Sequence, residues 1–203
     1  MMKMYVKTVI TIGFAIFLSS CSFSTFNLVD EGYKPKGKRI AVISGLNDDS
    51  NLFVAKMMTG ALDKVSVFKS LSQEKIAKAI KDYPINIKGP YSAAYLDVDV
   101  DYSKTDVNMI KELQRKLGVD YMYVLWIPLA TTSNGNVKQL HVVTQLFEFP
   151  GGKEVANGRF DVASVGGVLW RSMPTAEDDM KAAKETTEYV AKETAEKMGM
   201  LKR

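Results

Sequence analysis

Cysteine and histidine are almost absent from this 203-residue chain, which contains only Cys21 and His141. One cysteine cannot form an internal disulfide, and one cysteine with one histidine cannot form a Cys/His zinc site. No recognisable partner accompanies His141, so we expect a packed or surface histidine rather than a general base. Catalysis that depends on histidine therefore has little support.

Motifs of nucleotide and acyl-transfer chemistry are also missing. The chain contains no Gly-x-x-x-x-Gly-Lys, Gly-x-Gly-x-x-Gly or Gly-x-Ser-x-Gly pattern. One turn, residues 44–47, follows an apolar run where doubly wound sheets bind ligands, but a plain strand-to-helix turn fits it as well. Carboxylate pairs that could support a hydrolase cannot be assigned from sequence. We expect a noncatalytic protein without a cofactor.

Acidic residues alternate in one place, at Asp97, Asp99 and Asp101. A calcium loop would also alternate acids, but it requires glycine at its sixth position and glutamate at its twelfth, where this chain has Tyr102 and Asn108. An edge strand or loop with solvated carboxylates is the simpler interpretation, since charge on an edge discourages pairing with other chains. We therefore predict no metal site.

Strong net charge is missing as well. The formal charge is +4, and loss of Lys3 and Lys7 with a signal segment would leave 25 basic against 23 acidic residues, or +2. So small an excess disfavours a nucleic-acid partner. The chain is 46% apolar and 25% charged, which is ordinary for a folded domain.

The first 20 residues have the pattern of a secretory signal peptide. Two lysines precede an apolar stretch from Val9 to Leu18, which is shorter than the roughly 20 residues of a spanning helix. The stretch ends in Leu-Ser-Ser-Cys at residues 18–21, which resembles the bacterial lipobox. This resemblance implies cleavage between Ser20 and Cys21, followed by acylation of Cys21 and anchoring in the lipid bilayer. Ordinary signal cleavage or an uncleaved anchor, with Cys21 incidental, is the alternative.

The residues after the cysteine suggest a location and a linker. Ser22 follows Cys21, and a residue other than Asp there resembles lipoproteins exported to the outer membrane of Gram-negative bacteria. Residues 21–38 carry Gly, Pro and a basic end without a sustained apolar period, which predicts a lipidated tether. The basic end could contact anionic headgroups or form a solvated linker.

Residues 39–203 are predicted to form one α/β domain. The expected elements begin with strands at 39–44 and 65–68 and helices at 51–63 and 71–83, the second of which Ser70 would cap. A helix at 107–117 follows, with Thr105 or Asp106 as its cap and Gly118 at its end. Strands at 121–129, with Pro128 at the end, 137–149 and 154–162 precede a helix at 175–198 whose Glu- and Lys-rich side is expected to face solvent. The order β-α-β-α-α-β-β-β-α predicts a mixed sheet with an antiparallel C-terminal meander and a long terminal helix.

Three stretches resemble a bacterial envelope α/β domain. They are residues 38–43 as the first strand, 117–121 leading into the central strand, and 145–149 before the Gly151-Gly152 turn. The domain is shared by the curli-secretion lipoprotein, outer-membrane lipoprotein activators of penicillin-binding proteins, and the N-terminal domain of the Tol-system propeller protein. The resemblance implies a noncatalytic adaptor or activator. The chain departs from curli-type channels, which insert two long amphipathic hairpins into the membrane. Its spare segments, 85–104 and 163–174, are too short and alternate too little to supply such hairpins, so we expect no pore.

A loop over residues 164–174 is the candidate partner-binding segment. It contains Val168, Leu169, Trp170, Arg171 and Met173, residue types that resemble the enriched core of protein interfaces. Packing of Trp170 over the terminal helix is the alternative. The leading hypothesis is a membrane-tethered periplasmic module that docks an envelope-assembly or secretion protein. A homo-oligomer at the membrane and a small-ligand carrier remain as alternatives.

Overall fold

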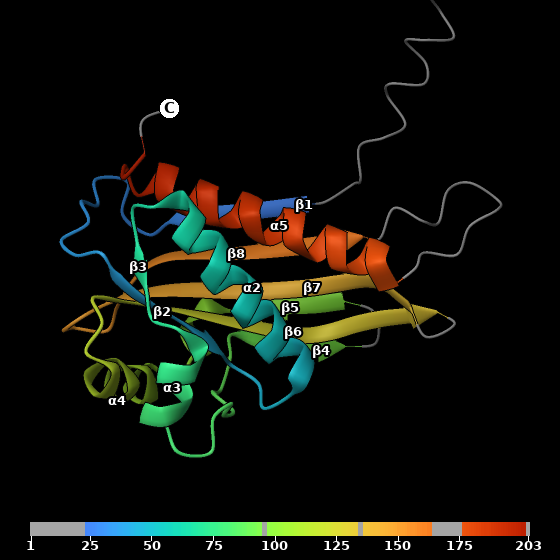
Figure 1. Ribbon diagram of the computed structural model, residues 1–203, viewed down its shortest axis with the longest axis horizontal. Coiled ribbons are helices and arrows are strands. Elements are labelled where there is room, and N and C mark those ends of the chain that lie inside the picture. Colours follow the sequence, from blue (N-terminus) through green and yellow to red (C-terminus); the bar gives the residue numbers. More distant parts are fainter. Residues whose placement is uncertain (1–22, 95–96, 134–135, 164–175, 202–203) are drawn as a thin grey trace, which may run out of the picture.

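The protein forms a mixed α/β fold, described here from a computed structural model for residues 23–94, 97–133, 136–163 and 176–201 (Figure 1). The strands are β1 Phe23–Leu28, β2 Arg39–Ser44, β3 Lys69–Ser70, β4 Tyr91–Ala94, β5 Asp97–Val100, β6 Tyr121–Ser133, β7 Asn136–Glu148 and β8 Lys153–Ala163. The helices are α2 Asp49–Val65, α3 Gln73–Ala79, α4 Val107–Leu117 and α5 Ala176–Lys197, with a short 3-10 turn at Tyr102–Lys104.

A six-stranded sheet organises the molecule in the order β1-β8-β7-β6-β2-β3. Strands β3, β2 and β6 are parallel to one another, whereas β6, β7, β8 and β1 form successive antiparallel pairs. The predicted mixed sheet, C-terminal meander and long terminal helix are therefore confirmed. Strands β4 and β5 pair separately as a small hairpin.

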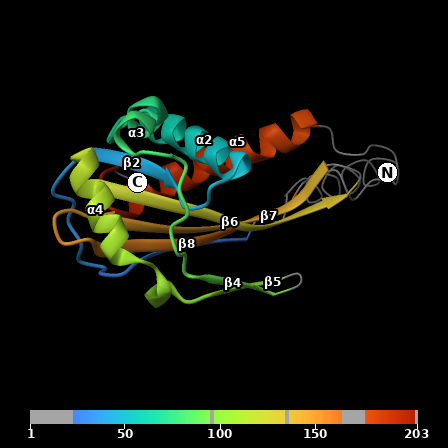
Figure 2. The same ribbon diagram turned by 90° about the horizontal axis from the view of Figure 1, so that it is seen from below.

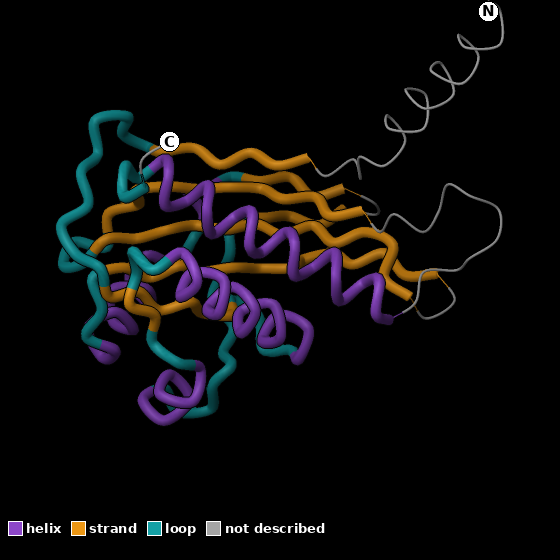
Figure 3. Tube along the Cα trace, turned by 45° about the horizontal axis from the view of Figure 1, so that its top comes forward, coloured by secondary structure: helices purple, strands orange, loops and turns teal. Residues whose placement is uncertain are grey.

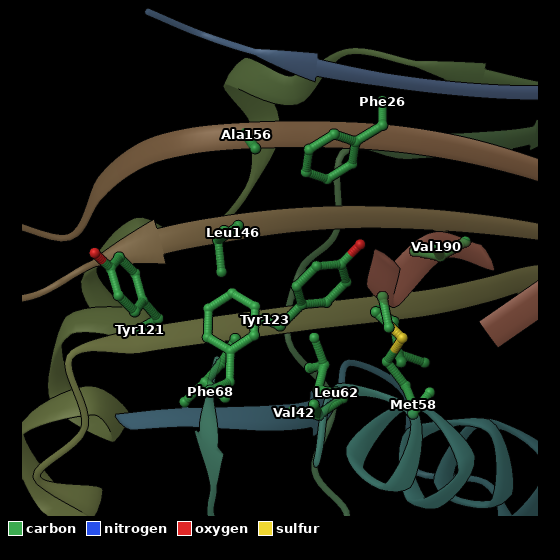
Figure 4. Packing of buried hydrophobic residues seen from close by; sticks show 14 of the residues in the cluster. Phe26, Val42, Met58, Leu62, Phe68, Tyr121, Tyr123, Leu146, Ala156 and Val190 are labelled. Atoms are coloured by element: carbon green, nitrogen blue, oxygen red, sulfur yellow. The ribbon is translucent and has the colours of Figure 1, made fainter. Parts of the chain in front are cut away.

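Apolar side chains fill both faces of the sheet. On one face, residues of β2, β6, β7, β8 and β1 pack against α2 and α5; this core includes Phe26, Met58, Leu62, Tyr123 and Val190 (Figure 4). The opposite-facing residues of β2, β6 and β7 pack against α3, α4 and the chain between them. Figure 2 shows α2 and α5 on one side of the sheet and the β4–β5 hairpin on the other.

The stretch expected to be a tether contains an edge strand. Residues Phe23–Leu28 pair with β8 in six consecutive positions, and Phe26 is only 2% exposed. The prediction of a tether is therefore wrong for these residues, because the meander offers the free edge of β8 and a place for Phe26 beneath α5. The loop of residues 29–38 then passes around the end of the sheet and joins β1 to β2 (Figure 3).

Hydrogen bonds to the sheet fix the end of this loop. The Asp120 carboxylate accepts from the backbone N–H groups of Lys38 and Arg39, at 2.9 and 2.8 Å. The Tyr33 hydroxyl lies 2.9 Å from both the Tyr121 hydroxyl and Glu148 Oε1. The folded unit thus includes residues 23–38, which precede the expected start at residue 39.

Two expected element boundaries in the first half of the chain are also wrong. Helix α2 continues through Val65, where a strand was expected, and the strand that follows is the two-residue β3. Ser72, and not Ser70, is the N-cap of α3, because Ser70 lies within β3. The helix ends earlier than expected, since Ile80 already has an extended backbone (φ −109°, ψ 113°).

The third helix and the strand after it show where local sequence is informative. Asp106 caps α4 by accepting from the Met109 N–H group at 3.0 Å, and Gly118 ends it with a left-handed φ of 59°. Gly118 was predicted, and Asp106 was one of the two candidate caps, with Thr105. Pro128 was expected at the end of the next strand, but β6 continues to Ser133. A register shift between Trp126 and Leu129 accommodates the proline, which lacks a backbone donor.

Candidate functional site

A tryptophan fills the position after β2, where doubly wound sheets bind ligands. At the turn, the Gly45 N–H group donates to the Leu125 carbonyl at 2.8 Å, and the Gly45 carbonyl accepts from Ile87 at 2.9 Å. A Cβ atom on Gly45 would lie 2.2 Å from Nε1 of Trp126, which is fully buried and donates to the Ile87 carbonyl at 3.0 Å. This end of the sheet is therefore occupied by the protein's own side chains.

A buried polar network lies behind this turn. The Gln73 amide donates to the Val42 carbonyl at 2.9 Å and to Thr59 Oγ1 at 3.0 Å. The Tyr83 hydroxyl donates to Gln73 Oε1 at 2.9 Å and accepts from the Ser44 N–H group at 3.1 Å. Burial raises the pKa of Tyr83, against the smaller opposing effect of the Ser44 hydrogen bond. The network joins β2, α2 and α3 through neutral groups, so it braces the fold.

The remaining predicted chemical residues do not converge. His141 is 3% exposed within β7, in line with a packed histidine. Asp99 and Asp101 are exposed on the β4–β5 side, and the hydrogen bonds that Ser103 donates to Asp101 lower the pKa of that carboxyl. Within the described residues, no group of three or more His, Cys, Asp and Glu side chains is placed to hold a metal ion.

The lipidation and loop candidates lie outside the described residues. These are Ser20 and Cys21 at the cleavage position, and Val168, Leu169, Trp170, Arg171 and Met173 in the partner-binding loop. Their roles remain predictions from sequence. No helix in the described part of the chain is long and apolar enough to cross a membrane.

A groove lies between α2 and α5, two helices that lie side by side (Figure 1). Two adjoining depressions of about 210 and 320 Å³ share Ala61, Lys64 and Glu188. We call this surface the α2–α5 groove; its other lining residues are Lys56, Met57, Gly60, Val65, Lys184, Thr187, Lys192 and Leu201. A Cβ atom on Gly60 would meet nothing within 4 Å, so the groove is open above that residue.

Lysine dominates the charge of the α2–α5 groove. Four lysines line it, against the single carboxylate of Glu188. Lys64 Nζ lies 2.5 Å from Glu188 Oε1, and this hydrogen bond is the main reason why the pKa of Glu188 is lowered. Lys192 Nζ is 3.6 Å from Glu196 at the rim. Lys56 and Lys184 add two further positive charges, so lysines outnumber carboxylates in the lining of the groove.

Sequence reasoning missed this groove. The charged side of the terminal helix was interpreted as a solvated face, and the groove exists only because α2 and α5 are neighbours in space. Lys56 and Lys184 are far apart in the chain, so no local motif joins them. The only available signal was Gly60, a weak helix former in an amphipathic helix.

The fold and this groove define a mixed-sheet α/β domain with a basic surface between two helices. No family model and no curated protein sequence matches the chain. Among solved structures, it is similar to the PelC dodecamer from Paraburkholderia phytofirmans, at 9% identity and a TM-score of 0.47, over 87% of this chain and 96% of that chain. It is also similar to lipoprotein GNA1162 from Neisseria meningitidis, at 12% identity and a TM-score of 0.46, over 78% and 99%. At these values the likenesses assign neither function nor assembly.

Proposed function

We propose that this protein is a bacterial envelope lipoprotein whose α/β domain is a noncatalytic interaction module for an acidic surface of another envelope protein. The anchor is Cys21, acylated after cleavage behind Ser20. Support comes from the sequence, in which the sole cysteine directly follows an apolar signal stretch and completes a lipobox-like motif. The Ser22 pattern favours the outer membrane, with the domain in the periplasm.

The noncatalytic part of the proposal is supported by Trp126, which fills the space beyond the carboxyl end of β2. Open α/β sheets bind ligands outside the carboxyl ends of their strands. Here the buried indole of Trp126 occupies that position and is held by the Ile87 carbonyl. A substrate could enter only if this side chain left the core.

Charge complementarity supports the α2–α5 groove as the docking surface. Its apolar floor includes Ala61, Val65 and Leu201, and lysines surround that floor. An acidic segment with a few apolar side chains would match both parts. Long-range attraction between the lysines and such a segment would also speed association and make it sensitive to salt.

The anchor predicts a complete loss of acylation in Cys21→Ala. With no thiol at this position, no thioether to a diacylglyceryl group can form, so the variant should take up no radioactive fatty acid and should leave the membrane fraction. The wild-type chain, expressed beside it, serves as the labelling control. Undiminished labelling of Cys21→Ala would show that the acyl group is attached elsewhere.

The groove predicts that charge reversal abolishes partner binding without unfolding the domain. A photo-crosslinking amino acid placed at Gly60, where the groove is open, should capture an acidic envelope protein in cells. Lys56→Glu with Lys184→Glu should remove that product, because the partner's carboxylates would then face like charge.

The matched control for this experiment reverses two exposed lysines outside the groove, Lys75 and Lys81. It makes the same change in net charge and should leave the crosslink intact. Equal loss in both double variants would show that only net charge matters. A product that contains two copies of this chain and no other protein would favour the homo-oligomer instead.

A further inference from the structure

The α2–α5 groove has a charged end and an apolar end. The smaller depression, of about 210 Å³, has Lys56 on one wall and Lys184 on the other. The larger depression, of about 320 Å³, is lined by Val65 and Leu201 and by neither of these two lysines. A ligand that fills the whole groove therefore needs negative charge at one end and apolar side chains at the other.

Two of the four groove lysines are available for a ligand carboxylate. Lys64 is paired with Glu188 at 2.5 Å, and Lys192 with a glutamate of its own helix at 3.6 Å. Within the described part of the chain, Lys56 and Lys184 have no carboxylate partner. Both line the smaller depression, so the positive charge that is not neutralised is concentrated there.

Helix α2 adds an apolar stripe to the same groove. Phe53, Met57 and Gly60 follow the helical spacing i, i+4 and i+7, so they share one side of α2. The side chain of Phe53 is 39% exposed, and Tyr189, next to Glu188 on α5, is 53% exposed. Aromatic residues and methionine are enriched in the cores of protein interfaces. The groove thus offers apolar contacts beside its unpaired lysines.

The walls of the groove favour a helical ligand over an extended one. An extended peptide needs partners for its backbone hydrogen-bonding groups, and it obtains them from the open edge of a sheet. Here the walls are two α-helices, whose backbone groups are bonded within each helix. A helix brings its own backbone hydrogen bonds, and amphipathic helices bind in grooves through side chains alone.

Gly60 allows such a helix to come close to α2. It is exposed within α2, and a Cβ atom added there would meet nothing within 4 Å. Glycine inside a helix costs about 1 kcal/mol relative to alanine, and no contact with the described residues requires it here. The distance between packed helices depends on the side chains at their contact, so a position without a side chain permits a close approach.

We propose that the α2–α5 groove binds an acidic, amphipathic α-helix of the partner protein. The helix lies along the groove, with its carboxylates at Lys56 and Lys184 and its apolar side over Gly60. From Lys56 to Val65, α2 rises about 14 Å, so two to three turns of the partner helix reach from the charged end to the apolar end. This inference rests on the proposed function, to which it adds the secondary structure and direction of the bound segment.

Crosslinks from two positions on α2 measure the secondary structure of the bound segment. Phe53 and Gly60 are separated by seven residue steps, or about 10.5 Å. Each is replaced in turn by a photo-crosslinking phenylalanine analogue in the full chain in cells, and the crosslinked residues of the partner are identified by mass spectrometry. A helix along the groove covers this distance in about seven residues, whereas an extended segment covers it in about three. We expect two sites about six to eight residues apart in one acidic segment.

The other outcomes distinguish failure of this inference from failure of the proposed function. Two sites about three residues apart, or in separate segments of an acidic partner, overturn the bound helix and leave the acidic docking surface in place. A crosslink only to a second copy of this chain, or no crosslink to another protein from either position, overturns both.

Two substitutions of Gly60 provide a matched comparison, with the crosslinker kept at Phe53. Gly60→Ala adds one methyl group in open space, so the crosslink yield should stay within about twofold of the wild-type yield. Gly60→Trp places an indole where the partner helix would lie and should lower the yield about tenfold. Circular dichroism checks that both variants are folded. Equal yields would show that the partner does not pack over Gly60, which overturns the inference, whereas reversal of Lys56 and Lys184 tests the proposed function separately.

Discussion

Replacing Trp126 with alanine is expected to lower the free energy of unfolding by about 3–5 kcal/mol, the usual range when a buried aromatic side chain is removed. Trp126 is the largest fully buried side chain among the described residues, and it lies in the core with Ala41, Ile43 and Ile87. Its removal opens a cavity beside the Gly45 turn and leaves the Ile87 carbonyl without its indole donor. Urea denaturation followed by circular dichroism measures the loss.

The variant Trp126→Phe distinguishes the contribution of the indole hydrogen bond to stability from the contribution of packing. Phenylalanine retains most of the apolar volume but cannot donate to the Ile87 carbonyl, so a smaller loss of about 1–3 kcal/mol is expected. Both variants should bind the acidic partner with unchanged affinity. The α2–α5 groove lies beside the core on one face of the sheet, whereas Trp126 lies in the core on the opposite face. If Trp126→Ala unfolds at the wild-type urea concentration, then the crevice is not closed by packing, and the noncatalytic proposal loses its main support.

The sequence predicts those parts of the fold whose signals are local. Helix α4 has its N-cap at Asp106 and its left-handed end at Gly118, so both boundaries follow from the chemistry of single residues. The uniformly apolar start of β6 predicts burial on both faces, and Tyr121, Tyr123 and Trp126 are indeed fully buried. Sheet order, in contrast, had to be inferred from the succession of elements.

The missed elements depend on partners distant in the chain. Strand β1 alternates Phe23, Thr25 and Asn27 with Ser24, Phe26 and Leu28, a weak pattern that becomes a strand only because β8 leaves an edge open. Likewise, the α2–α5 groove combines two lysines of α2, Lys56 and Lys64, with two lysines of α5, Lys184 and Lys192, which lie more than a hundred residues later in the chain. Trp126 was recognised as part of a central strand, but its position over Gly45 follows from the parallel pairing of β2 with β6.

The buried network around Gln73 gives the second large effect, which we expect from Gln73→Leu. Leucine keeps the apolar volume but removes the donor to the Val42 carbonyl and Thr59, and the acceptor of the Tyr83 hydroxyl. Buried polar groups that lose a partner cost about 1–3 kcal/mol each, so a loss of about 2–4 kcal/mol is expected. The midpoint of urea denaturation should fall while the slope is unchanged.

Tyr83→Phe tests whether this loss arises from the network itself. The single change leaves Gln73 Oε1 and the Ser44 N–H group without the Tyr83 hydroxyl, so it should destabilise the fold as well. In the double variant, the Tyr83 hydroxyl that Gln73→Leu leaves without an acceptor is also absent. The loss of unfolding free energy in the double variant should therefore be smaller than the sum of the losses in the two single variants. Strict additivity would show that Gln73 and Tyr83 act independently. A shortfall would show that Gln73 and Tyr83 act together to fix α3 against the carboxyl end of β2.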